Sequence, residues 1–102
     1  MLYFKSQQDG RVLFKLSDHE HGQLVKMGLL RPGTTGSLAD DGAEILPLFD
    51  DFELTVEHQR SMYAFAEAKR QELLKIPGFQ SALMTRFLDL LKREEHLDVT
   101  CD

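Results

Sequence analysis

Two closely spaced histidines, His19 and His21, flank Glu20 and are the residues that most invite a metal site. Side chains on one face of a helix are three or four positions apart, whereas residues two apart point in different directions. Neither histidine has a partner at the four-residue step, so a zinc site is not indicated. The spacing predicts solvated histidines near the start of a helix and no metal ion.

Paired carboxylates occur at Asp40-Asp41 and at Asp50-Asp51. The first pair, followed by Gly42, is too short for a calcium loop, which needs acids at alternate positions and a Glu about six residues after its Gly. The second pair has the groups for acid–base chemistry, but catalysis also needs a pocket and a second set of polar groups. The sequence reveals neither, so these pairs do not predict an active site.

The single cysteine, Cys101, lies near His96 and Asp98 in the sequence. We expect it in a loose tail, where a thiol is not held in place for nucleophilic attack. No glycine-rich loop joins a strand to a helix in the manner of a phosphate site. The sequence therefore predicts a protein that is not an enzyme and has no cofactor. One cysteine cannot form an internal disulfide, which favours a reducing cytoplasm.

Acidic residues are concentrated in one part of the chain. The whole chain has 17 acids and 12 bases, for a formal charge of −5, but residues 32–59 contain seven acids and no Lys or Arg. A net negative charge argues against broad affinity for nucleic acid or acidic membrane. Acids interleaved with apolar side chains suit a basic protein surface, since charge speeds encounter and apolar groups hold the complex.

This acidic stretch is the predicted partner-binding surface. Its residues are Asp40, Asp41, Glu44, Asp50, Asp51, Phe52, Glu53 and Glu57. An alternative stays open, in which the stretch is a solvated loop and Phe49, Phe52 and Leu54 are ordinary core anchors. The acids near Thr55 also favour the N-terminus of a following helix, where the macrodipole is positive.

The elements that would position these residues begin with a helical hairpin over 55–97. Thr55 caps a first helix from Val56 to Ile76, which is rich in good helix formers. Pro77 and Gly78 end that helix and let the chain fold back. A second helix is expected from about Phe79 to about His96.

The second helix has an apolar arc of about 240° on a helical wheel, whereas packing on one neighbour needs only about 100°. The helix is therefore either buried on two sides or has a face left over for a partner or a second copy of the chain. That spare face would comprise Met84, Leu88 and Leu91. On this alternative the protein is a homodimer through its C-terminal helices.

The N-terminal part is predicted to be a β-hairpin followed by a short helix. Strand formers occur on both sides of Asp9-Gly10, a strong hairpin signal. With a two-residue turn, Tyr3 and Phe14 would share a face, and Phe4 would lie on the other. Ser17 and Glu20 form a capping box for a helix to about Met27, with Gly28 as its C-cap. Pro47 limits any strand over 43–49 to an edge or shortens it.

The segment from Leu24 to Leu46 resembles part of a winged-helix transcription regulator. It reads Leu-Val-Lys-Met-Gly-Leu-Leu, a loop, and Ser-Leu-Ala-Asp-Asp-Gly-Ala-Glu-Ile-Leu. The resemblance implies the end of a recognition helix, the wing and the start of the next helix. It covers under a quarter of the chain. The two helices that should precede the recognition helix are missing, because residues Leu2 to Leu16 look like strand.

These observations predict one small α+β domain over 1–102. Its parts are a β-hairpin (1–16), a short helix (17–30), an acidic loop and edge-strand region (31–54), a helical hairpin (55–97) and a tail (98–102). No apolar run is long enough to span a membrane, and the first residues lack the order of a signal peptide. The expected function is non-catalytic protein binding, as in an inhibitor, immunity-type protein or adaptor that masks a basic site. The alternative is a winged-helix-like DNA-binding regulator.

Overall fold

The computed structural model describes residues 1–33, 45–47 and 51–101, with side chains for 1–30 and 51–101. The predicted α+β class is confirmed, as is the order of an N-terminal hairpin, a short helix and C-terminal helices. The elements in chain order are β1 (Leu2–Ser6), β2 (Val12–Leu16), α1 (Asp18–Lys26), β3 (Arg31–Gly33), β4 (Ile45–Pro47), β5 (Phe52–Leu54), α2 (Val56–Leu73), α3 (Ala82–Leu91) and β6 (Leu97–Cys101).

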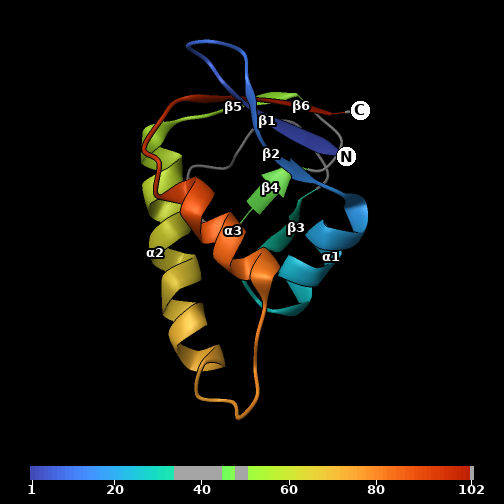
Figure 1. Cartoon of the computed structure of the whole chain (residues 1–102), viewed down its shortest axis with the longest axis vertical. Coiled ribbons are helices and arrows are strands. Elements are labelled where there is room, and N and C mark those ends of the chain that lie inside the picture. Colours follow the sequence, from blue (N-terminus) through green and yellow to red (C-terminus); the bar gives the residue numbers. More distant parts are fainter. Residues whose placement is uncertain (34–44, 48–50, 102) are drawn as a thin grey trace.

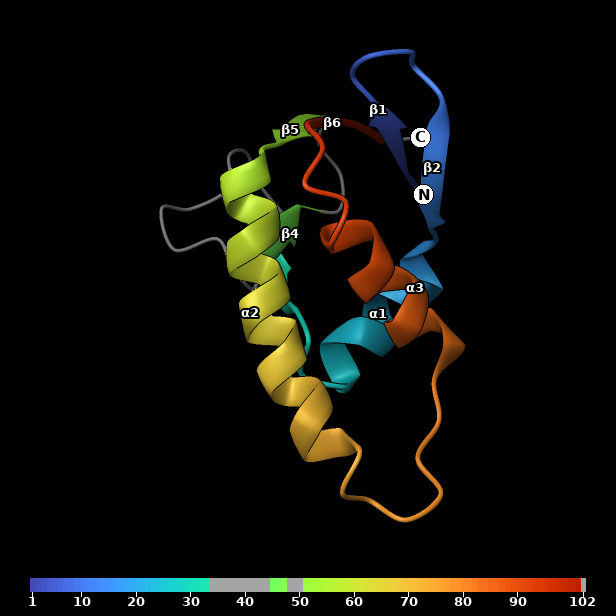
Figure 2. The same cartoon turned by 60° about the vertical axis from the view of Figure 1, so that its left-hand side comes forward.

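An antiparallel sheet joins the two ends of the chain. Its strand order is β2-β1-β6-β5, while β3 and β4 form a separate parallel pair. The four-stranded sheet lies at one end of the molecule with the helices on one side of it, and the two termini lie next to each other (Figures 1 and 2). Leu2 of β1 is opposite Cys101 of β6, so the first and last strands are neighbours.

The tail predicted over 98–102 was wrong for the described residues, because Leu97–Cys101 is strand β6 at the centre of the sheet. Leu97 and Val99 are buried on one face, and Asp98 and Thr100 alternate with them on the other. This period of two is the pattern of a half-buried strand. The strand is stabilised by partners that are distant in the sequence, on β1 and β5.

The prediction that Tyr3 and Phe14 share a face of the β1–β2 hairpin was wrong, because the strands pair in a different register. Phe4 is opposite Phe14, and both side chains are buried, with ring centroids 5.6 Å apart in an edge-to-face arrangement. The two-residue turn is also replaced by a longer one, in which the backbone N–H of Ser6 bonds to the carbonyl of Arg11. A different turn length changes the register, and a one-residue shift moves every side chain to the other face.

Helix α1 begins and ends as its sequence signals predict. Ser17 and Glu20 form the capping box, each accepting a backbone hydrogen bond from the other. At the other end Gly28 has φ +81°, and Leu29 N–H bonds to the carbonyl of Leu24. This pattern is a Schellman motif, and Leu24 and Leu29 are both buried there.

The C-terminal helices are shorter than predicted. Thr55 caps α2 as expected, but the helix ends at Leu73, and Gly78 has φ +78° in the connection that follows. Ser81 accepts a hydrogen bond from the backbone of Met84, so α3 begins after Ser81 and not at Phe79. It ends at Leu91, well before His96, because the chain turns into β6.

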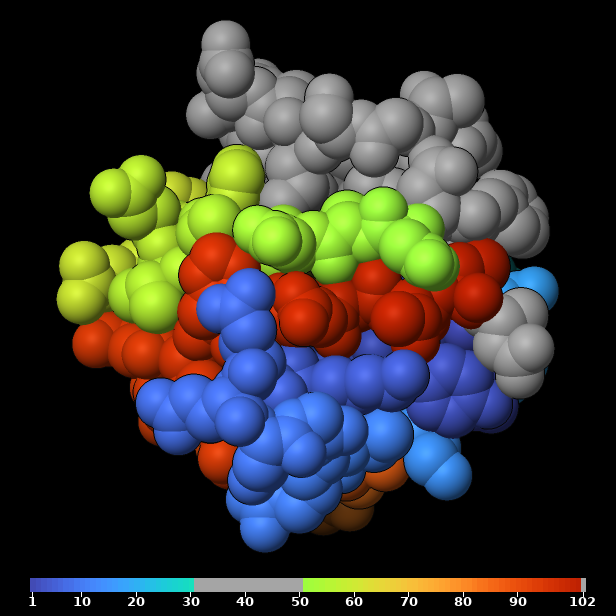
Figure 3. Space-filling view, turned by 90° about the horizontal axis from the view of Figure 1, so that it is seen from above, coloured from blue at the N-terminus to red at the C-terminus, as the bar shows by residue number. Residues whose placement is uncertain are grey.

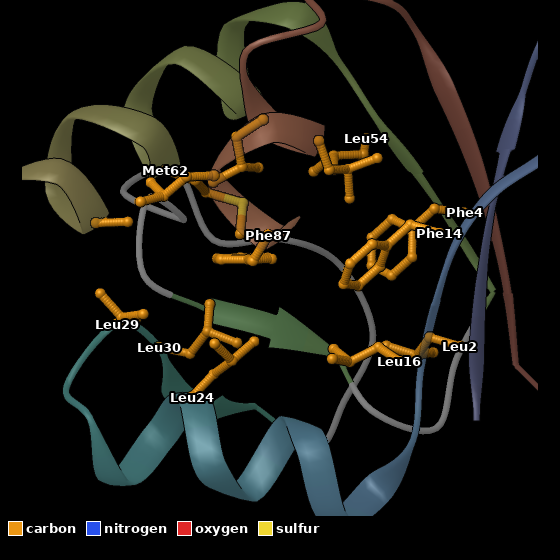
Figure 4. Close-up of a cluster of buried hydrophobic side chains, with 14 of the residues drawn as sticks. Leu2, Phe4, Phe14, Leu16, Leu24, Leu29, Leu30, Leu54, Met62 and Phe87 are labelled. Carbon is orange, nitrogen blue, oxygen red and sulfur yellow. The ribbon is translucent and has the colours of Figure 1, made fainter. Parts of the chain in front are cut away.

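The core lies between the sheet and the three helices (Figure 4). The sheet contributes Leu2, Phe4, Phe14 and Leu16, and the helices contribute side chains such as Met62 and Phe87. Other buried members are Leu24, Leu29, Leu30, Leu54, Ala66, Leu83, Met84, Leu88, Leu90, Leu91, Leu97 and Val99. One apolar cluster therefore holds the sheet, all three helices and the segment after α1 together.

Candidate protein-binding surface

The sheet has an outer face that points away from the helices. Figure 3 looks onto this face, on which β5, β6, β1 and β2 lie side by side. Because Leu97, Val99, Phe4 and Ser6 are buried on the inner side, the residues between them point outward. Charged residues of the outer face are therefore available to another molecule.

A row of three charged residues crosses this outer face. Lys5 of β1 is opposite Asp98 of β6, and Asp98 is in turn opposite Glu53 of β5. Residues directly opposite on antiparallel strands have Cβ atoms about 4.5–5.5 Å apart, and like charges there are destabilising. The fold thus places two carboxylates next to each other at the β5–β6 end of the row, with one lysine on the far side of Asp98.

The carboxylate of Glu53 contacts a neighbouring imidazole. Its Oε2 lies 3.3 Å from Nε2 of His96, the residue before β6. Glu53 is 65% exposed, so a contact of this kind contributes little to stability. The pair is an ion pair only when the imidazole is protonated. Glu53 is therefore able to exchange this contact for a permanently charged group.

A shallow hollow of about 350 Å³ adjoins the two carboxylates. It is lined by Asp51, Phe52, Glu53, Asp98, Val99 and Thr100, which come from β5 with the residue before it and from β6. Phe52 is half-buried and packs partly on the core, and Leu54 is fully buried. The interpretation as core anchors is thus confirmed for Phe52 and Leu54, while Phe49 lies outside the described residues. The acids beside Phe52 line an open surface.

Asp51 has a structural role as well as a surface position. Its Oδ1 accepts a hydrogen bond of 2.7 Å from the backbone N–H of Cys101. This bond ties the chain before β5 to the end of β6. Neutralising Asp51 would therefore disturb the sheet as well as the surface charge, and Glu53 and Asp98 are the better residues for testing a surface.

The structure describes half of the predicted partner-binding residues. Asp51, Phe52 and Glu53 meet at the hollow, whereas Glu57 is exposed in the first turn of α2. The remaining predicted residues lie outside the described part of the chain; they are Asp40, Asp41, Glu44 and Asp50. Sequence reasoning missed Asp98 and Thr100, which the alternation of Leu97 and Val99 with polar residues could have revealed.

The second predicted surface, on α3, is not available. Met84, Leu88 and Leu91 are 3%, 4% and 1% exposed, so the prediction of a dimer or partner face there is corrected. Helix α3 packs against α2 and beneath the sheet (Figures 1 and 2). The wide apolar arc reflects burial on more than one side, which was the other alternative.

Of the candidate catalytic residues, Asp40, Asp41 and Asp50 lie outside the described part of the chain, and the fold does not bring Cys101 and Asp98 to one face. Cys101 follows Leu97 and Val99 on the inner face of β6, whereas Asp98 is on the outer face. His19 is exposed on α1 and His21 is buried. No group of three or more His, Cys, Asp or Glu able to hold a metal ion occurs among the described residues.

A polar cleft of about 580 Å³ lies between the β1–β2 turn and the connection from α3 to β6. The connection from α3 to β6 contributes charged side chains to this cleft, and most of them form ion pairs within the chain. Arg93 lies 3.2 Å from Glu95, and Glu94 pairs with Arg60 outside the cleft. Hydrogen bonds from Ser6 and then Arg93 lower the pKa of Glu95. The cleft therefore presents charges of both signs, whereas Glu53 and Asp98 place two carboxylates side by side on the sheet.

The segment that resembles a winged-helix regulator has a different structure. Residues Ile45–Pro47 form strand β4, where the resemblance implies the start of a helix. Strands β3 and β4 pair in parallel and therefore do not form a β-hairpin. The geometry thus gives the DNA-binding alternative no support.

Comparison of the chain with protein-family models, curated proteins and solved structures gives no match. Among the described helices, none is both long enough and apolar enough to cross a membrane.

Proposed function

We propose that this chain is a non-catalytic protein-binding module that covers a basic site on a partner protein. It would act as an inhibitor, an immunity-type protein or an adaptor. The observation that carries the proposal is the position of Glu53 opposite Asp98 on the outer face of the sheet. Two adjacent carboxylates are unfavourable in the free protein, and a lysine or arginine of a partner placed between them would relieve that repulsion.

The mechanism is electrostatic and steric masking. Acidic residues speed the encounter with a basic surface, and the contact then blocks that surface to its own ligand. The other acidic residues between Asp40 and Glu57 would add to the negative charge that attracts a basic partner. We place this interaction in the cytoplasm, since the single cysteine suits a reducing setting.

The test compares the wild type with the double variant Glu53→Gln/Asp98→Asn. Tagged protein captures partners from an extract, and association rates with a purified partner are then measured by stopped flow over a range of salt concentrations. We expect a basic partner. The variant should associate about 3–10-fold more slowly at low salt, with a flatter salt dependence.

The matched control is Asp18→Asn/Glu72→Gln, which changes the net charge equally at positions on α1 and α2, outside the hollow beside Glu53 and Asp98. Both side chains are well exposed, at 66% and 68%. The control should associate at nearly the wild-type rate. Equal rates for the wild type and the Glu53/Asp98 variant would contradict the proposed surface, and salt-sensitive binding of duplex DNA would instead favour the regulator alternative.

A further inference from the structure

Strand β2 forms an edge of the four-stranded sheet. Among the described strands it pairs with β1 alone, and it carries the sequence Val-Leu-Phe-Lys-Leu. An edge strand presents unpaired backbone N–H and C=O groups, which can add a further strand. Lys15 is the single charged residue within β2, so little charge opposes pairing along this edge.

A groove of about 270 Å³ lies between β2 and α3. Its apolar lining comes from Leu13 and Phe14 of β2 and from Leu90 of α3. The register of β1 and β2 shifts here, since Phe14 pairs with Phe4 and Val12 with Lys5. Leu13 is therefore an unpaired, bulged residue, and its side chain lines the groove instead of joining the regular alternation. Edge and groove are thus adjacent, as required for binding an extended peptide.

The charged lining of the groove is mainly positive. Arg86 and Arg93 face one carboxylate, that of Asp89. Arg86 is 58% exposed and lies 3.4 Å from Glu20, and Arg93 is 41% exposed and pairs with Glu95. Each guanidinium has more N–H donors than these contacts use, so it can bind a further carboxylate in the groove while it keeps its present partner. This local positive charge is opposite in sign to the net charge of −5.

We propose that the edge of β2 and the adjoining groove bind an extended acidic peptide segment of a partner protein. The segment adds to the sheet as a fifth strand beside β2. One of its apolar side chains fills the groove over Leu13 and Leu90, and its carboxylates bind Arg86 and Arg93. This site is separate from the acidic surface at Glu53 and Asp98, which lies on β5 and β6, across β1 from β2.

The test uses a fluorescent peptide of alternating Val and Glu and a matched peptide of alternating Val and Lys. Binding to the full chain is followed by anisotropy, and the site is mapped by amide chemical shifts. We expect the acidic peptide to bind with a Kd of about 1 mM or tighter and to shift residues 12–16 and 86–93. The basic peptide should bind at least about tenfold more weakly there, although the net charge of the protein favours it.

Two perturbations separate strand addition from simple charge attraction. Arg86→Gln/Arg93→Gln should weaken the acidic peptide about tenfold, and Lys26→Gln/Lys75→Gln, with the same change in net charge, should not. N-methylation of alternate peptide amides removes backbone hydrogen-bond donors from the peptide and leaves the protein unchanged. Two peptides are compared, one methylated at odd positions and one at even positions. Only one of them should lose binding, because an added strand bonds to β2 through alternate amides. Absence of binding at about 1 mM, shifts confined to other residues, or equal binding of methylated peptides in both registers would overturn the proposal.

Discussion

Arg60 and Glu94 form a two-point ion pair that joins α2 to the connection between α3 and β6. Arg60 Nε lies 3.1 Å from Glu94 Oε1, and Nη2 lies 3.3 Å from Oε2. The hydrogen bonds from Arg60 lower the pKa of Glu94 and raise that of Arg60, to which the charge of Glu57 also contributes. Glu94 has φ +51°, in the left-handed region that side chains other than Gly rarely adopt.

The backbone of Glu94 gives the first prediction. Glu94→Gly and Glu94→Ala both remove the ion pair, but only the glycine variant relieves the left-handed backbone. The glycine variant should therefore melt a few degrees above the alanine variant. At Thr85, an exposed position within α3, the same two substitutions should rank in the opposite order, because glycine weakens a helix. Thermal unfolding by circular dichroism checks both rankings, and a less stable Glu94→Gly would contradict the assignment of strain.

Gln59 gives the second prediction. It is fully buried on α2, and its Nε2 donates to the carbonyl of Leu54 at 3.1 Å and to the carbonyl of Glu95. Gln59→Leu leaves both carbonyls without this donor and should destabilise the fold by about 2 kcal/mol. Urea unfolding measures the change, and Gln23→Leu on the exposed face of α1 should stay within about 0.5 kcal/mol of the wild type.

The Gln59→Glu variant adds a pH test at the same position. A carboxylate would be buried facing carbonyl oxygens, which should cost about 3 kcal/mol or more at neutral pH. Burial raises the pKa of the introduced carboxyl, so the loss should be smallest below about pH 4, where the group is neutral in both states. Unfolding curves at pH 4 and 7 check the sign, and a pH-independent loss would argue against burial of this side chain.

The ion pair of Glu67 with Arg70 on α2 gives the third prediction. The distance from Arg70 Nη2 to Glu67 Oε1 is 2.8 Å, and hydrogen bonds from Arg70 and then Gln71 lower the pKa of Glu67 to about 2. A lowered pKa means stabilisation that is present above about pH 4.5 and lost as the pH falls towards 2. Because both side chains are partly exposed, Glu67→Gln should cost only about 0.5 kcal/mol at pH 7.

The difference between wild type and Glu67→Gln is the quantity to measure over pH. It should shrink between about pH 4.5 and pH 2, even though both proteins lose stability from other carboxylates such as Glu20 and Glu95, whose pKa values are also lowered. Glu20 owes its lowered pKa first to the backbone hydrogen bond of Ser17. A difference that stays constant over this range would mean that the Glu67–Arg70 pair does not form.

Leu91 gives the fourth prediction. It is 1% exposed, so Leu91→Ala should destabilise the fold by about 2–5 kcal/mol through the cavity it leaves. Leu74→Ala, at a side chain that is 49% exposed, should cost less than about 1 kcal/mol. Light scattering after size exclusion should give the same mass for both variants and the wild type. A lower mass for Leu91→Ala without loss of stability would restore the dimer face on α3.

Much of the local structure followed from short-range signals in the sequence. Ser17, Gly28 and Thr55 predicted helix boundaries correctly, because a cap acts on backbone groups only a few residues away. The hairpin and the reversal at Gly78 were predicted for the same reason. The acidic character of 51–57 was also evident, since charge is a property of composition.

Tertiary structure decided which of these residues form a surface. Asp98 joined Glu53 only because β6 pairs with β5, and β6 also pairs with β1 from the far end of the chain. Such pairing depends on contacts between distant segments, which no local pattern specifies. The burial of Leu91 was decided in the same way. A wide apolar arc shows that a helix needs cover on more than one side, but whether that cover is the same chain or another depends on where the sheet packs.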